Sequence, residues 1–166
     1  MNIKKTANLL INFTLKRLAE IFGIVIFFSG LLLLTSLLTY SPEDPNFIFP
    51  KNTEIQNILG IKGSIISDLF FQSVGLISYL ISITLVITGI NILIVKKNFL
   101  IIENIFFIVI YSIFGTLFLN HYYFNTFTLY INGNGGFVGT YLSNSFLNSF
   151  IYVNEHIAYY LLIIII

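Results

Sequence analysis

An uncharged apolar stretch long enough to cross a lipid bilayer is the feature that most constrains this sequence. The residues from Ile21 to Leu38 carry no charge, and the uncharged run continues to Pro42. A helix of about 20 residues, at about 1.5 Å per residue, crosses a hydrocarbon core of about 30 Å. The whole chain has the same character, since 57% of its 166 residues are hydrophobic and only 9% are charged. A soluble domain carries about 25% charged residues, so we predict an integral membrane protein.

The same composition excludes several other classes of protein. The net charge is only +1, so no basic surface is available to hold nucleic acid. The chain has no cysteine, which excludes a disulfide framework, a CxxC redox pair and a thiolate zinc site. Basic residues precede the first apolar stretch, as in a signal peptide. That stretch is too long for a signal peptide and no small-x-small cleavage site follows it, so we predict a retained anchor.

Four apolar segments predict four spanning helices, at about residues 19–39, 72–95, 100–119 and from 148 to 166 and beyond. Six of the eight basic residues lie in the N-terminal segment or in the short turn at Lys96–Lys97. The positive-inside rule therefore predicts that both termini and this turn are cytoplasmic, with both long loops facing outward. We predict one all-α integral membrane domain over residues 1–166.

The two long loops share a sequence pattern, which predicts two copies of one hairpin. Residues 60–70 and 136–146 both read G-x-x-G-[ST]-x-x-S-[DN]-x-F, at an offset of 76 positions. Small residues four positions apart occupy one helix face in each copy. This pattern predicts a short interfacial helix before span 2 and another before span 4. We expect leucine to reduce assembly more at Gly63 or Gly139 than at Ser36.

Ionisable residues near the spans are candidates for function, because charge is costly in a membrane. Glu20 follows Arg17 by three positions, which allows the two to pair on one helix face. Glu103 lies one turn into span 3, close to Lys96, and is also expected to be interfacial. Asp68 precedes span 2, where a carboxylate favours the helix dipole. All three acidic residues are therefore expected to be structural.

Glu155 and His156 are harder to assign, and a proton-relay or metal-binding role for the pair stays open. Adjacent helical residues point about 100° apart, so the two do not readily share one ion. The glycine-rich loop at residues 133–136 lacks the lysine of a Walker A motif. No nucleophile–base pair, HExxH motif or EF-hand pattern is present in the sequence. We predict no catalytic residue, no cofactor and no metal in this chain.

Two short motifs frame the first long loop. A Y-S-P-x-D-P stretch begins at Tyr40, and an N-x-x-G-x-x-G stretch begins at Asn57. Together with the hairpin spacing, these motifs resemble the N-terminal four-helix membrane region of the FtsK/SpoIIIE family of DNA translocases. Asn46 and Phe47 depart from that pattern, in which Ser or Thr and then Trp are usual. The residues that carry the resemblance and the repeat are Tyr40, Pro42, Asp44, Pro45, Asn57, Gly60, Gly63, Asp68, Gly75, Gly136 and Gly139.

The resemblance implies the membrane anchor of a translocase that acts in bacterial cell division and chromosome segregation. Its implied partners are the lipid bilayer, further copies through the full-length protein, and other membrane proteins of the division machinery. The implied location is the bacterial cytoplasmic membrane, enriched at the septum, with no nucleic acid contacted by this region. The ATPase motor would lie beyond Ile166. The last apolar segment stops there without a basic flank, which predicts that the native protein continues into the cytoplasm.

The residues themselves leave other functions open. A small oligomeric transporter or channel subunit would need polar residues recurring along the spans, and spans 1–3 have only scattered Ser and Thr. A membrane-embedded enzyme would rely on Glu155 and His156. The Y-S-P-x-D-P stretch is itself either a simple exit loop, because Pro42 and Pro45 stop the helix, or a docking surface for another envelope protein.

Overall fold

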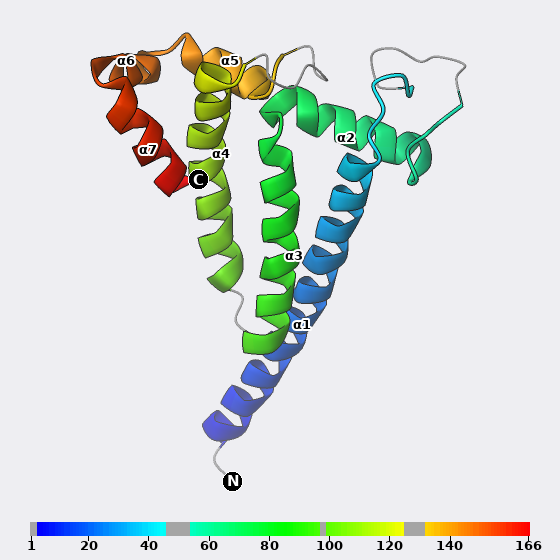
Figure 1. The fold of residues 1–166 in the computed structure, drawn as a ribbon. Helices are drawn as coiled ribbons and strands as arrows, with labels where there is room; N and C mark the ends of the chain where they lie inside the picture. Colours follow the sequence, from blue (N-terminus) through cyan, green and yellow to red (C-terminus); the bar gives the residue numbers. More distant parts are fainter. Residues whose placement is uncertain (1–2, 46–53, 97–98, 125–131) are drawn as a thin grey trace.

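The computed structural model describes residues 3–45, 54–96, 99–124 and 132–166, and its regular structure in these ranges is helical throughout. Three helices are long and apolar enough to span a membrane: α1 (Ile3–Leu38), α3 (Ile77–Val95) and α4 (Phe99–Tyr122). These helices form the bundle seen in Figure 1. The prediction of an all-α chain with long apolar helices is therefore confirmed. Asn46, Phe47 and Lys97 lie outside the described residues.

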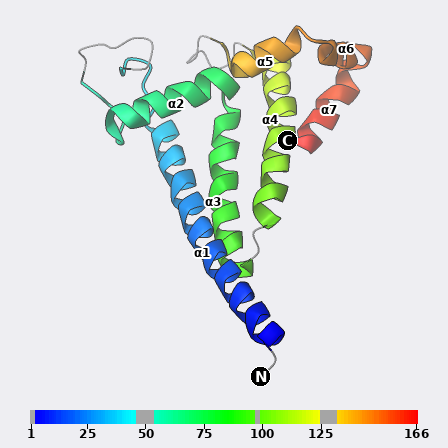
Figure 2. The same cartoon turned by 180° about the vertical axis from the view of Figure 1, so that it is seen from behind.

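Three shorter helices lie across one end of this bundle, which we call the capped end. They are α2 (Gly60–Val74), α5 (Gly136–Ser143) and α6 (Phe146–Val153). Figures 1 and 2 show them roughly perpendicular to the long helices, with the N-terminus at the opposite end. The repeat predicted short helices before spans 2 and 4, and α2 and α5 occupy those positions.

The closest packing between the long helices is between α1 and α3, where glycines let the two backbones approach. A Cβ on Gly30 would lie 2.7 Å from Val86 N, and a Cβ on Gly89 would lie 2.5 Å from Phe27 N. Small residues have this role in membrane helices because hydrophobic driving force between helices is absent in lipid. The small residues at helical spacing along α3 and in the turn before it are all buried: Gly75, Ser78, Ser82 and Gly89.

The second span begins at Ile77 rather than at residue 72, because the chain turns at Gly75. Gly75 has φ 60 and ψ −139, a conformation that glycine adopts far more readily than other residues. Its N–H donates to Phe71 O at 3.0 Å and so closes α2. Residues 72–74 therefore belong to the crossing helix α2 and not to the span.

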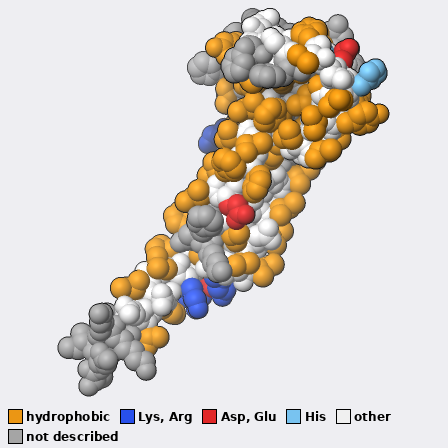
Figure 3. Space-filling model, turned by 90° about the vertical axis from the view of Figure 1, so that its left-hand side faces the viewer, with side chains coloured by type: hydrophobic (Ala, Val, Ile, Leu, Met, Phe, Trp, Pro, Cys, Tyr) orange, Lys and Arg blue, Asp and Glu red, His pale blue; other side chains and the backbone are white. Residues whose placement is uncertain are grey.

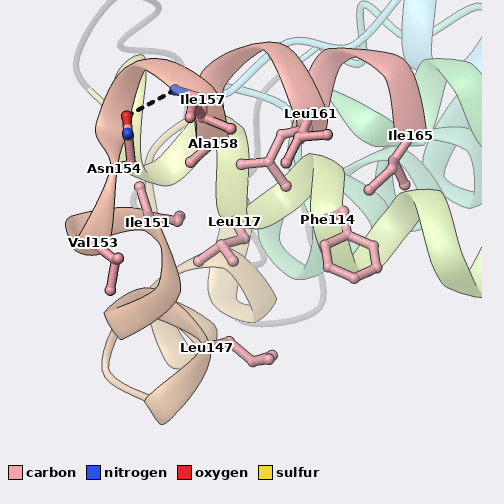
Figure 4. Close-up of a pocket in the computed structure, with 11 residues that line it drawn as sticks. Phe114, Leu117, Leu147, Ile151, Val153, Asn154, Ile157, Ala158, Leu161 and Ile165 are labelled. Carbon is pink, nitrogen blue, oxygen red and sulfur yellow. Dashed lines mark hydrogen bonds between the residues drawn. The ribbon is translucent and has the colours of Figure 1, made fainter.

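The last apolar segment is divided into two helices, which corrects the expectation of one continuous helix from residue 148 to 166. α6 ends at Val153, and α7 (Glu155–Ile165) begins after Asn154, whose backbone is extended. The Asn154 side chain accepts a hydrogen bond from Ile157 N at 3.3 Å (Figure 4), as an N-cap residue does. α7 then descends beside α4 (Figure 2). Its 11 residues are fewer than the roughly 20 that cross a bilayer.

Candidate functional site

The C-terminal end of α1 is closed by side chains from other elements. The last carbonyls of a helix have no partner within it, and an unpaired carbonyl is costly in a membrane. Asn57 Nδ2 donates to Ser36 O at 2.9 Å and to Thr39 O at 3.3 Å. The Tyr79 hydroxyl of α3 donates to Leu37 O at 3.2 Å. The loop and α3 together determine where α1 ends.

The Asp44 carboxylate holds the following loop against this helix end. Its side chain is buried, Oδ1 accepts a hydrogen bond from Gln56 N at 2.8 Å, and Oδ2 accepts one from Asn57 N at 2.9 Å. Hydrogen bonds to a carboxylate are roughly twice as strong as neutral ones. The carbonyl of Pro45 also accepts a hydrogen bond from Ser64 Oγ of α2 at 2.7 Å. The two motifs of the sequence therefore form one folded unit.

Gly63 lets α2 lie directly against the end of α1. Ser36 Oγ donates to Gly63 O at 2.6 Å, and a Cβ added to Gly63 would overlap Asn57 Oδ1. Ser36 is 1% exposed, so leucine at Ser36 would disturb the same contact as leucine at Gly63. Leucine at Ser36 is therefore not a neutral reference for leucine at Gly63. The sequence pattern of α1 does not reveal that this serine faces a helix 27 positions further along the chain.

Aromatic rings fill the space beneath the loop. Phe71 of α2 is fully buried, and its ring centroid lies 4.9 Å from that of Tyr40 and 5.4 Å from that of Tyr79. The Tyr40 hydroxyl donates to Asp68 Oδ1 at 3.1 Å. Asp68 was expected at the start of span 2, but it lies within α2 and is buried. Its carboxylate therefore joins α2 to the end of α1 instead of capping a spanning helix.

The motif residues of the first loop thus gather in one place, which we call the cap cluster. Most of their polar atoms point inward, whereas Pro42 and Glu43 are exposed at the turn. Gly60 begins α2 with φ 66, and no atom lies within 4 Å of a Cβ added to it. The buried groups hold the described part of the loop in shape and leave the turn at Pro42 and Glu43 accessible. The cap cluster comprises Tyr40, Pro42, Asp44, Pro45, Asn57, Gly60, Gly63 and Asp68.

A second contact joins the turn between α2 and α3 to the segment before α5, and we call it the junction. Leu76 N, at the start of α3, donates to Asn134 O at 2.9 Å. Gly75 and Gly136 pack against each other here, and a Cβ on Gly136 would lie 2.6 Å from Gly75 N. The sequence placed Gly75 in span 2 and Gly136 in the second long loop, and nothing in their local pattern reveals that they meet. The junction comprises Gln72, Gly75, Asn132, Asn134 and Gly136.

Gly139 makes the close contact that the repeat predicts for the second copy. A Cβ on Gly139 would lie 2.6 Å from Thr116 O of α4, so α5 rests directly on the α4 backbone. The expectation of a close helix contact is therefore confirmed for Gly139, whereas the close contact of Gly63 is with Asn57 and Leu59, which precede α2. Their neighbours differ, because Gly63 faces a side-chain amide and Gly139 faces a helix carbonyl.

The ionisable residues at the other end of the bundle form a small network. Glu20 binds Arg17, as predicted, and Glu20 Oε1 also lies 2.6 Å from Lys96 Nζ at the end of α3. Glu103, expected near Lys96, is exposed on α4, while Lys96 is bound to Glu20 instead. Figure 3 shows hydrophobic side chains covering one face of the bundle, with one basic group just below the capped end and other basic side chains towards the lower end of the bundle. The Glu20–Lys96 pair therefore ties α1 to α3 at this end.

Glu155 pairs with His121 rather than with its neighbour His156. Glu155 is the first residue of α7, and its Oε1 lies 3.6 Å from His121 Nε2 on α4. The Tyr122 hydroxyl also donates to the Glu155 carbonyl at 2.9 Å, while His156 is exposed. Within the described parts of the chain, no group of three or more His, Cys, Asp and Glu could hold a metal ion. The arrangement around Glu155 holds α7 against α4.

Comparison with known protein families identifies the region to which this chain is similar. The model of the family described as the 4TM region of DNA translocase FtsK/SpoIIIE matches residues 15–166, which include the cap cluster and the junction. This match confirms the resemblance that the motifs of the first loop predicted. No curated protein and no solved structure matches the chain.

Proposed function

Because this chain belongs to the family of FtsK/SpoIIIE 4TM regions, we propose that it is the membrane anchor of an FtsK-type DNA translocase. In this role it acts in bacterial cell division and chromosome segregation. It works through contacts with other membrane proteins of the division machinery at the septum, and it oligomerises through the full-length protein. These residues contact lipid and protein, while ATP hydrolysis and DNA binding belong to the motor of the translocase.

The observation that carries this proposal is the cap cluster, in which the family motif forms a folded loop. Asp44 and Asn57 fix this loop through buried hydrogen bonds to backbone groups. Pro42 and Glu43 then lie at an exposed turn on a fixed scaffold. Loops held by a rigid scaffold are frequent sites of binding residues. This turn is the part of the cluster that we assign to contact with a division protein.

We also propose that the chain has four spans with both termini in the cytoplasm. Arg17 and Lys96 meet at Glu20, far from the capped end, and basic residues favour the cytoplasmic side. The capped end then faces outward. α7 is the first part of the fourth span, supported by the apolar cluster that Leu162 of α7 forms with Leu117 of α4.

Single cysteines test this orientation, since the chain has none of its own. A cysteine at Glu54, which is exposed at the capped end, is expected to react with a membrane-impermeant maleimide in intact cells. A cysteine at Asn98, between α3 and α4 in the sequence, is expected to react only after lysis. Reaction at Asn98 in intact cells would overturn the proposed orientation.

A fluorescent fusion tests the division role. In dividing bacteria we expect the fusion to form a band at mid-cell, and we expect Glu43→Lys to lower the mid-cell fraction at least twofold. The reason is that Glu43 lies at the exposed turn that we assign to partner contact. Asn144→Lys is the control, because Asn144 is also exposed at the capped end but lies between α5 and α6, on a different segment from that turn. Uniform fluorescence around the membrane for the unchanged fusion would contradict the proposed role.

A further inference from the structure

An apolar groove lies beneath α2 at the capped end. Its walls come from α1, α2 and α3, and its volume is about 520 Å³. Ligand-binding sites commonly have volumes of about 300–1,000 Å³, so this groove is large enough to hold a small molecule or a segment of one. The side chains that give its walls their apolar character are Leu32, Leu33, Ile66, Phe70 and Leu85.

The polar groups in the walls are already engaged, so the groove presents hydrocarbon to its occupant. Ser29 Oγ donates to Ile26 O at 2.9 Å within α1. Ser36 Oγ donates to Gly63 O across the contact between α1 and α2. Neither hydroxyl needs a partner from a ligand. An occupant of this groove therefore has to be apolar along its length.

Among the residues that the structure describes, Lys62 is the only charged one that lines this groove. It is exposed on α2, and among the described residues it forms no ion pair. A lysine side chain can lie along an apolar surface while its ammonium group reaches the polar interface. The groove of about 420 Å³ between α4, α6 and α7, shown in Figure 4, has no charged lining residue. The groove beneath α2 is therefore apolar in its interior and positively charged at one point.

We propose that this groove binds an acyl chain of an anionic glycerophospholipid, with the lipid phosphate bound to the Lys62 ammonium. The charge of Lys62 and the apolar walls match the two parts of such a lipid. The position of α2 supports this occupant, because Ile61 and Leu69 are exposed on the same helix as Lys62. A helix that carries exposed apolar and basic residues together is suited to the boundary between headgroups and acyl chains. The bound acyl chain then packs against α2 on the side that faces the groove and adds apolar contacts next to the cap cluster.

Fluorescence quenching tests this proposal, since the chain contains no tryptophan. Phe70→Trp places a single reporter in the groove wall. We measure quenching of this tryptophan in phosphatidylcholine vesicles that contain one brominated lipid. From the quenching we expect an association constant about fivefold larger for brominated phosphatidylglycerol than for brominated phosphatidylcholine. A fivefold ratio corresponds to the roughly 1 kcal/mol that one basic residue contributes near an anionic lipid surface. Lys62→Gln in the same background is expected to reduce the ratio to about one.

Two further variants make the result specific. Phe106→Trp places the reporter on α4, where Phe106 is 61% exposed, and both brominated lipids are expected to quench it equally. Leu32→Trp reports on the same groove if Phe70→Trp does not fold. Equal quenching of the groove reporter by both lipids with Lys62 intact would overturn the proposal. Absence of quenching, together with cross-linking between copies at Leu32, would instead assign the groove to a second copy of the chain.

Discussion

Replacing Asn57 with alanine is expected to lower the free energy of unfolding by about 3 kcal/mol. Asn57 Nδ2 donates to the Ser36 and Thr39 carbonyls at the end of α1, and Asn57 Oδ1 accepts from Leu59 N at 3.1 Å. Alanine removes all three hydrogen bonds at a site that is 3% exposed, where water cannot easily replace them. A buried polar group left without its partner costs about 1–3 kcal/mol. Denaturation by SDS in mixed micelles, or thermal unfolding in detergent, measures the loss.

Two other variants show whether the loss comes from the hydrogen bonds of Asn57. Gln56→Ala removes a neighbouring exposed side chain and leaves its N–H bonded to Asp44, so we expect a change within about 0.5 kcal/mol. Asn57→Asp keeps an acceptor for Leu59 N but places a carboxylate against two carbonyl oxygens. We therefore expect Asn57→Asp to be at least as destabilising as Asn57→Ala. If Asn57→Ala were as stable as Gln56→Ala, the end of α1 would not depend on this amide.

The long helices could be predicted from the sequence because each depends on a local property. A run of about 20 apolar residues must pair its backbone groups within itself in lipid, and only a helix does so in a single segment. α1, α3 and α4 therefore appear where the hydropathy places them. The crossing helices α2 and α5 could be predicted because the repeat places equivalent glycines at the start of each.

The division of the last segment was missed because its hydropathy is continuous, although the polar residues carry a signal. Ser145 Oγ accepts a hydrogen bond from Leu147 N at 3.3 Å, and Asn154 has the same role at the start of α7. Serine and asparagine are strong N-cap residues, and Glu155 directly after Asn154 adds an acidic residue to the first turn. Capping residues within an apolar segment therefore indicate a helix break that average hydropathy conceals.

The composition of the cap cluster could be predicted only in part, since its contacts link residues far apart in the chain. The family motif identified Asp44 and Asn57, which lie 13 positions apart and bond directly. It did not identify Ser36 or Tyr79, which complete the same site from the two long helices. Serine and tyrosine are common in membrane helices, and nothing in their local sequence distinguishes those that cap a neighbouring helix from those that bond within their own.

The junction tests whether the turn between α2 and α3 and the segment before α5 depend on each other for stability. Gly75→Ala is expected to lower the free energy of unfolding by about 3 kcal/mol or more. The added Cβ would overlap Asn134 O, a backbone atom that accepts the Leu76 N–H, and it would lie 2.9 Å from Gly136 N. Backbone atoms cannot move aside as the end of a flexible side chain can, and overpacking of this kind costs about 1–3 kcal/mol. The backbone of Gly75, with φ 60 and ψ −139, adds a further cost of roughly 1–3 kcal/mol for any residue with a Cβ.

Gly60→Ala is the control, because it adds a Cβ at a residue with positive φ without creating an overlap. Gly60 has φ 66, close to the φ 60 of Gly75, but no atom lies within 4 Å of a Cβ added there. Alanine at Gly60 is therefore expected to cost only about 1–2 kcal/mol, the conformational part alone. If the two variants lost equal free energy of unfolding, backbone conformation would account for the whole effect. The overlap of the added Cβ with the junction would then contribute nothing.

A cross-link between the copies reports on the junction directly. Asn132 Nδ2 donates to the backbone and side-chain oxygens of Gln72, each at 3.3 Å, so cysteines at these two positions lie within reach of a short thiol cross-linker. We expect efficient cross-linking in the otherwise unchanged chain and in Gly60→Ala, and a several-fold lower yield in Gly75→Ala. The lower yield follows because the overlap at Asn134 forces the loop before α5 away from the turn between α2 and α3. An unchanged yield in a destabilised Gly75→Ala protein would place the damage within the first hairpin and leave the second copy packed as before.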